Sequence, residues 1–263
     1  MATAYSETYT TPVSNRTVYI NYILTNYNDI TINSISSSVR NSNQFGVNGT
    51  YFIPGTTNLV GIAINNGAQV RNYGTMNRDP RVCTSMFKCG TMVCPKSSTT
   101  GIVLFTDVID RIDNGWTYNG ETFTMSNIKW AIGGTSLFPN DSLDETTYKN
   151  KISTEDPGGG VAGIAPRTAI IYTGGTLSSN MVLLSVQSSA NDGSPDSGGF
   201  TFWELREYIR NKFKTPNGTP PVHAIALDGG GSTQIRYKDS AGAVKCYQVA
   251  GDRNVNSMVS TIM

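Results

Sequence analysis

The chain has a single histidine, His223, and this scarcity removes the chemistry that needs a histidine base. Asp196-Ser197-Gly198-Gly199 resembles the nucleophile segment of trypsin-like proteases. That chemistry requires a histidine base, and His223 lies inside an apolar run and after the serine, on the wrong side for that order. We therefore interpret His223 as a packed strand residue rather than a catalyst.

Charge and long apolar runs are also scarce. Charged residues make up 15% of the chain and the net charge is +1, so neither a nucleic acid polymer nor an anionic membrane is expected as a partner. No apolar run approaches the roughly 20 residues that span a bilayer. Residues 1–16 are polar and lack the apolar core of a secretory signal, which predicts a cytoplasmic protein, in the host cytoplasm if it is viral.

The chain has four cysteines, and three of them, Cys83, Cys89 and Cys94, form a cluster without a CxxC pair. A zinc site would need other ligands, because only one histidine is present. A disulfide and reduced, packed thiols are the two further interpretations, and a cytoplasmic location favours the thiols. There is also no P-loop and no GxGxxG after an early strand. We expect no cofactor and no bound metal.

Asn, Ser, Thr and Gly are abundant, a composition typical of strands and turns. Apolar runs predict short strands at 16–24, 30–36, 45–53, 59–64, 102–108, 128–132, 169–172, 181–186 and 222–227. A hairpin is expected through Lys238 to Ala243. Residues 72–98 and 139–160 lack periodicity and are interpreted as long loops or insertions.

One helix is predicted clearly. Phe202, Leu205, Ile209 and Phe213 keep helical spacing, and Thr201 with Glu204 forms a capping box at the start. Few other helical segments are predicted. From the order of the motifs along the chain, which are given below, we predict one α+β domain over 1–263, with a twisted, largely antiparallel sheet and few helices.

The most informative segment is Ala226-Leu-Asp-Gly-Gly-Gly-Ser-Thr233. The apolar run before it predicts a buried strand that places Asp228 at its end. The glycines that follow allow a sharp turn and close approach of a ligand, and successive N–H groups in such a turn can bind an anion. A structural alternative is a tight turn with a capping aspartate.

Four further segments belong with this one. They are Gly46-Val-Asn-Gly-Thr-Tyr-Phe52, Trp130-Ala-Ile-Gly-Gly134, Pro166-Arg-Thr-Ala169 and Gly251-Asp-Arg-Asn-Val-Asn256. In this order, and with the predicted helix, they resemble the phosphodiester glycosidase family, which includes an enzyme that removes N-acetylglucosamine from a sugar-1-phosphodiester. The resemblance covers about residues 46–263 and leaves N-terminal strands in 1–45. Ala165 stands where the family often has a histidine.

The resemblance implies a hydrolase that cleaves the glycosidic bond between an anomeric carbon and a phosphate. The substrate would be a small-molecule or glycan phosphodiester, or a nucleotide-derived one. The expected catalytic residues are Asp228, Asn48 and Glu204. The expected substrate-binding residues are Arg167, Arg253, Gly49, Thr168, Gly229, Gly230, Gly231, Ser232 and Asn256.

The residue types suit this chemistry. A guanidinium group can donate two parallel hydrogen bonds to two oxygens of one phosphate, so Arg167 and Arg253 are candidates for binding the leaving phosphate. A carboxylate activates water or stabilises the sugar cation, and Asp228 is the best candidate. Glu204 is a second carboxylate whose capping position also explains it, and Asn48 orients a hydroxyl or water, or simply forms the Asn-Gly turn.

Two other classes of function remain open. The same fold could bind a phosphodiester or nucleotide ligand without cleaving it. A particle-associated viral protein with a degraded site is the other alternative. The joint presence of Asp228, Arg167, Arg253 and Asn48 favours an enzyme, and the oligomeric state is not predicted.

Overall fold

The computed structural model describes residues 2–12, 15–73, 84–113, 115–155, 163–174, 179–188, 198–215 and 217–263. Cys83 and the Asp196-Ser197 pair, considered above, lie outside these residues. Within them no helix is both long and apolar enough to cross a membrane.

The largest sheet has ten strands, and all of its pairings are antiparallel. Its main path runs through β1 (Thr3–Thr10), β2 (Thr17–Thr25), β13 (Met181–Gln187), β12 (Arg167–Tyr172), β14 (His223–Ala226), β11 (Ile128–Ser136), β5 (Ala63–Asn65) and β6 (Ala68–Gln69). Off this path, β7 (Thr84–Pro95) pairs with β11, and β8 (Phe105–Arg111) pairs with β7.

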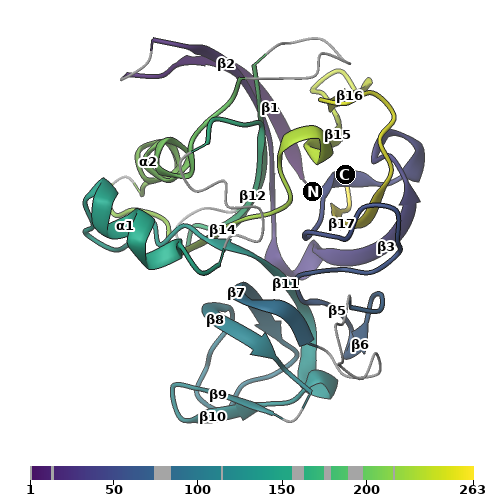
Figure 1. Ribbon diagram of the computed structural model, residues 1–263, viewed down its shortest axis with the longest axis vertical. Coiled ribbons are helices and arrows are strands. Elements are labelled where there is room, and N and C mark those ends of the chain that lie inside the picture. The colour runs from purple at the N-terminus through teal and green to yellow at the C-terminus, as the bar shows by residue number, and fades with distance from the viewer. Residues whose placement is uncertain are drawn as a thin grey trace.

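A second sheet has five strands in the order β16 (Val244–Gln248), β15 (Gln234–Lys238), β4 (Phe45–Asn48), β17 (Val255–Thr261) and β3 (Thr31–Ser37). A small hairpin pairs β9 (Trp116–Tyr118) with β10 (Glu121–Phe123). The α-helices are α1 (Glu145–Ile152) and α2 (Phe202–Lys212), and the short 3-10 helices are η1 (Tyr27–Asp29), η2 (Arg40–Ser42), η3 (Met125–Asn127) and η4 (Gly230–Ser232). Figure 1 shows both α-helices on one side of the large sheet and the five-stranded sheet on the other, with β7–β10 as a lower lobe.

Both faces of the central strands are covered, which explains their continuous apolar sequences. In β13, Val182 and Leu184 pack into the core beneath the helices. Leu183 between them packs into the core shared with the five-stranded sheet and the lower lobe. Because neighbouring residues of a strand point to opposite faces, a strand buried on both faces needs apolar residues without alternation.

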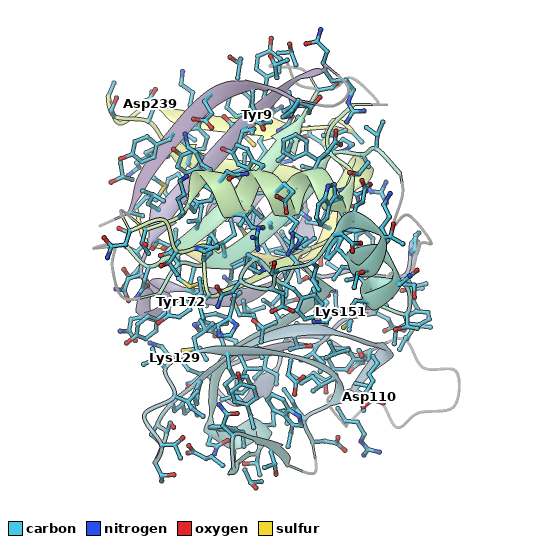
Figure 2. The ribbon with its side chains drawn as sticks, turned by 90° about the vertical axis from the view of Figure 1, so that its left-hand side faces the viewer. Tyr9, Asp110, Lys129, Lys151, Tyr172 and Asp239 are labelled. Carbon is cyan, nitrogen blue, oxygen red and sulfur yellow. The ribbon has the colours of Figure 1, made fainter. Side chains whose placement is uncertain are left out.

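Helix α2 begins where the capping box predicts, and it ends at Lys212. The Thr201 side chain accepts a hydrogen bond from the Glu204 backbone N–H, and the Glu204 carboxylate accepts one from the Thr201 backbone N–H. Phe202, Leu205 and Ile209 are buried against the large sheet. Figure 2 shows this helix lying across the sheet face that it covers. The hairpin between β15 and β16 is also where it was expected, with Asp239 N–H donating to Ala243 O at 2.9 Å.

The fold is mainly β, with largely antiparallel sheets and two α-helices in the described part of the chain, so the α+β description is only partly correct. The strand expected over 45–53 ends at Asn48, and the following residues form a loop closed by a bridge between Phe52 and Leu59. The strand expected over 59–64 is shorter and starts at Ala63.

The loops expected over 72–98 and 139–160 contain regular structure, which corrects that prediction. β7 is a twelve-residue strand whose second half is buried on both faces, so its sequence does not alternate. Helix α1 buries Tyr148 and Ile152, one turn apart, which is too short an apolar pattern to identify a helix. Asp144 caps α1 by accepting from the Thr147 N–H at 2.8 Å.

Candidate active site

A cavity of about 540 Å³ opens where β14 ends and the glycine-rich turn begins. Two charged residues predicted for the site, Arg167 and Asp228, line it together. Its other lining residues are Tyr51, Phe52, Ile53, Pro54, Val60, Met86, Phe87, Ala165, Phe202, Gly229 and Gly230. The cavity therefore combines a carboxylate and a guanidinium with walls that are mostly aromatic and aliphatic.

The backbone at Asp228 is held from two sides. The Leu227 N–H donates to Thr168 O at 2.8 Å, and the Asp228 N–H donates to Gly49 O at 3.1 Å. The Gly49 N–H in turn donates to Ser257 O at 2.8 Å. A Cβ at Gly49 would lie 2.3 Å from the Ser257 Oγ, so only glycine allows this approach. Gly49 thus connects the Asp228 segment to β17.

The Asp228 carboxylate is half-buried and has partners that suit its charged form. It accepts hydrogen bonds from the Ser232 hydroxyl and the Gly229 N–H, and the positive charge of Arg253 acts on it. Burial outweighs these three effects and raises the pKa of Asp228 to about 6. A carboxyl group with this pKa can take up a proton and still be largely ionised at neutral pH.

The glycines of the turn are needed for its backbone conformation and hydrogen bonds, independently of any ligand. Gly230 has a φ of +55° and its N–H donates to Pro166 O at 2.9 Å. A Cβ at Gly229 would lie 2.9 Å from Pro166 O, and one at Gly231 would lie 2.9 Å from the Arg253 Nη1. The N–H groups of Gly229 and Gly230 are thus already bound to the Asp228 carboxylate and to Pro166 O.

Asn48 connects four segments behind the cavity and does not line it. Its Nδ2 donates to Asp228 O at 2.7 Å. Its Oδ1 accepts from the Thr168 Oγ1 at 2.7 Å and from the Gln234 N–H at 3.0 Å. Asn48 and Thr168 are both buried, so these bonds are shielded from water. Asn48 and Thr168 therefore position the segment that carries Asp228.

The two arginines occupy different surroundings. Arg167 is 7% exposed, stacks 3.9 Å from the Phe202 ring centroid, and donates from Nε to Phe200 O at 2.9 Å and from Nη2 to Gly163 O at 2.6 Å. Arg253 is exposed and lies beside Gly231, with its guanidinium 5.9 Å from the Phe52 ring centroid. Arg167 thus forms part of the cavity wall, while Arg253 presents its charge to solvent near Asp228.

Besides Asn48 and Thr168, two further predicted site residues, Glu204 and Asn256, lie outside the lining of this cavity. Glu204 closes the capping box of α2, and both of its oxygens accept from the Arg16 Nη2, at 3.0 and 2.7 Å. Asn256 lines a neighbouring groove, where its Nδ2 donates to Thr56 O at 2.8 Å. The structure thus gives Glu204 a structural environment and places Asn256 beside the cavity rather than in it.

Several wall residues were not predicted. Met86 and Phe87 line the cavity from the start of β7, in a segment without recognisable periodicity. Tyr51 and Phe52 follow Asn48-Gly49-Thr50, and Phe202 follows the helix cap, so their positions next to expected site residues were an available signal. The Tyr51 hydroxyl lies 3.0 Å from the Thr135 Oγ1.

A fully buried carboxylate, Glu155, lies outside the lining of the cavity. It accepts from the Gly90 N–H at 2.9 Å and from the Ser136 N–H at 2.8 Å, which joins the end of the α1 segment to β7 and β11. Burial raises the pKa of Glu155. Among the described residues Asp228 is therefore the one carboxylate that lines the cavity.

The remaining candidates lie elsewhere. His223 lines a different, small cavity at the other end of β14, and burial lowers its pKa to about 4. Cys89 and Cys94 are free and buried, and burial raises the pKa of these thiols to about 11 and about 12. Within the described ranges no group of three or more His, Cys, Asp or Glu residues has a geometry suited to a metal ion.

A solved structure with a related fold has little sequence in common with this chain. A hypothetical protein from Synechocystis superposes with a TM-score of 0.51 at 13% identity, over 98% of this chain and 62% of that one. A protein of Burkholderia pseudomallei that carries the label of an exported protein gives 0.36 at 10% identity, over 99% of this chain and 59% of that one. The chain thus spans about three fifths of the length of each.

No match was found among curated proteins. The sequence profile of the phosphodiester glycosidase family, in contrast, matches residues 41–260. This range contains Asn48, Arg167, Asp228 and Arg253, and it covers most of the chain. The protein therefore belongs to the phosphodiester glycosidase family.

Proposed function

We propose that this protein is a hydrolase that cleaves the bond between a sugar anomeric carbon and a phosphate in a glycosyl phosphodiester. The observation that carries the proposal is the Asp228 carboxyl, with its pKa raised to about 6, in a cavity with aromatic walls and near two arginines. A catalytic carboxyl group works best when its pKa lies near the operating pH. Aromatic rings such as those of Tyr51 and Phe202 offer apolar surface to the faces of a sugar ring.

The reaction needs one base and a site for the leaving phosphate. As the C1–O bond breaks, its electron pair passes to the phosphate oxygen and leaves a phosphate monoester. A water molecule attacks C1, and its proton passes to the Asp228 carboxylate. Arg253, which is exposed near Asp228, stabilises the charge that develops on the phosphate. Arg167 adds a fixed positive charge in the cavity wall.

The single carboxylate in the lining fits this leaving group. Most glycosidases use two carboxyl groups because an alcohol must be protonated as it leaves. A phosphate monoester leaves as a stable anion, so electrostatic stabilisation replaces the general acid. Asp228 alone can then serve, with Asn48 and Thr168 as positioning residues rather than catalytic ones.

A ligand-binding module is the second candidate, and the same lone carboxylate is the observation in its favour. Such a module would hold a phosphodiester between Arg253 and the aromatic walls without cleaving it. The two candidates differ in one measurable respect, which is whether a product forms.

The test is incubation of the protein with the methyl esters of glucose 1-phosphate and N-acetylglucosamine 1-phosphate, and with the nucleoside-diphosphate derivatives of the same two sugars, in ¹⁸O-water. Mass spectrometry then reads the phosphorus-containing product. Cleavage at C1–O predicts free sugar and a phosphate monoester without the label, because the new oxygen enters at carbon. A labelled phosphate would contradict the proposal.

Matched variants identify the residue responsible. Asp228→Asn should lower the rate of cleavage by roughly 10²–10⁴-fold, whereas Asp239→Asn, at the exposed β15–β16 turn, should leave it intact. Figure 2 shows Asp239 at the periphery of the molecule. Tight binding of these esters by the wild-type protein without any product would favour the binding module.

A further inference from the structure

A groove of about 700 Å³ adjoins the active-site cavity, and Phe52 lines both. The residues that line this groove are Ser36, Phe52, Gly55, Thr56, Thr57, Asn58, Asn254 and Asn256. Except for Phe52 and Gly55, all of them carry a hydroxyl or a primary amide, and none carries a charge. The groove therefore differs in chemistry from the cavity beside it.

The two walls of the groove are connected by hydrogen bonds. On one side, the loop after Phe52 is closed by Ile53 N–H donating to Asn58 O at 3.0 Å and by Thr56 N–H donating to Ile53 O at 3.1 Å. The Asn256 Nδ2 of β17 donates to Thr56 O at 2.8 Å. Asn256 is 8% exposed, so this bond is shielded and fixes the loop against the strand.

Amide groups remain available for a ligand on both walls. Asn254 and Asn256 flank the buried Val255, and residues two apart at the start of a strand face the same side. The side chains of Asn58 and Asn254 make no hydrogen bond to the described part of the chain. Each primary amide offers two donor hydrogens and one acceptor oxygen, which is the combination that sugar and polyol hydroxyls require.

Arg253 lies next to residues of both the cavity and the groove. It immediately precedes Asn254, its guanidinium lies 5.9 Å from the centroid of the shared Phe52 ring, and its charge acts on Asp228. In a glycosyl phosphodiester the phosphate likewise stands between the sugar and the second alcohol. A phosphate held by Arg253 would direct the sugar toward Asp228 and the alcohol toward the amides.

We infer that this groove binds the alcohol of the phosphodiester, and that this alcohol is an uncharged polyol or sugar. The inference rests on the proposed function for the position of the phosphate. A lipid alcohol would need a long apolar wall, and a further phosphate would need cations. The groove has neither among its lining residues.

The experiment uses the phosphate product, so that the identity of the cleaved sugar does not matter. Binding of glycerol 3-phosphate and of methyl phosphate to the wild-type protein is measured by isothermal titration and by NMR shifts. One to three hydrogen bonds from glycerol hydroxyls should favour glycerol 3-phosphate by about 3- to 30-fold. The Asn58→Ala/Asn254→Ala double variant should lose this preference, while Asn211→Ala on the outer side of α2 should keep it.

Arg253→Ala should weaken binding of both phosphates and leave their ratio unchanged. Equal binding of the two phosphates, undetectable binding of glycerol 3-phosphate, or a preference that survives the double variant would each overturn the inference. If the double variant were unstable by thermal unfolding, Thr57→Val would remove a groove hydroxyl from an exposed loop residue instead.

This outcome is separable from that of the proposed function. A preference for glycerol 3-phosphate in a protein that cleaves no glycosyl phosphodiester would support the groove and contradict the hydrolase. Cleavage of such esters without any preference would support the hydrolase and contradict the groove.

Discussion

The strand β14 has a half-buried titratable residue near each end, and the surroundings of these two residues differ. His223 begins the strand, and Asp228 follows its last residue by two positions. Burial is the largest cause of the pKa shift in both, lowering the pKa of His223 to about 4 and raising that of Asp228 to about 6. In each case burial favours the neutral form.

The difference lies in the opposing effects. Around Asp228, the Ser232 hydroxyl, the Gly229 N–H and the charge of Arg253 all favour the ionised form. Desolvation is the one cause that shifts His223, whose ring stacks on Tyr172 at 6.1 Å. One end of β14 is therefore arranged to hold a charge inside the protein, and the other is arranged to exclude one.

The largest effect should come from removing the ionisable group at each end. Asp228→Asn should lower turnover by roughly 10²–10⁴-fold, the range for a positioned acid–base group. His223→Gln should leave turnover within about twofold, because His223 is neutral and lines a different cavity from the one that holds Asp228. Steady-state kinetics on a cleaved glycosyl phosphodiester measures both. A comparable loss of turnover in both variants would contradict the difference that we draw between the two ends of β14.

A smaller effect is expected from Arg253→Ala. Loss of its phosphate contact should lower kcat/KM by roughly 10- to 100-fold, consistent with one charge-assisted contact. The charge of Arg253 also lowers the pKa of Asp228, so the acid limb of the pH–rate profile should move from about 6 to higher pH. An unchanged limb would show that this charge does not reach Asp228. Arg236→Ala, in β15, provides the control.

Asp228→Asn should also make the fold more stable at high pH. The folded-state pKa of about 6 lies above the ordinary value of 3.8, so the native state binds the proton more tightly. Stability is therefore lost as pH rises through about 6, and a neutral Asn avoids this loss. We expect a gain of about 1–2 kcal/mol at pH 8 that disappears near pH 4, measured by urea unfolding. A gain that is independent of pH would contradict the assigned cause.

The smallest effect is expected for His223, whose contribution to folding stability is lost as the pH falls, whereas that of Asp228 is lost as the pH rises. Its folded-state pKa of about 4 lies below the ordinary 6.5, so its contribution is complete above 6.5 and is lost as pH falls toward 4. When the pH is lowered from 7 to 5, the free energy of unfolding should therefore fall by about 1 kcal/mol less in His223→Gln than in the wild type. This figure allows for the partial exposure of His223. Urea unfolding at the two pH values measures the difference. An equal acid loss in both proteins would mean that His223 is not desolvated.

Local patterns in the sequence were sufficient for some elements. The capping box of Thr201 and Glu204 predicts the start of α2 because both of its hydrogen bonds form within one turn. The turn after Lys238 is likewise local. β7 was missed because the lower lobe and Glu155 bury its small and polar residues, and no local signal reports that burial.

The sequence alone determined the family, the helix cap, most of the central strands and the placing of Asp228 at a strand end, because these depend on nearest neighbours and on ordered motifs. Only the tertiary structure decided which side chains meet. It gave Asn48 three hydrogen bonds behind Asp228, placed Glu204 outside the lining of the cavity, and made Phe52 a lining residue of both the cavity and the groove. The physical reason is that sheet pairing brings distant segments into contact, and burial then sets which polar groups must bind each other.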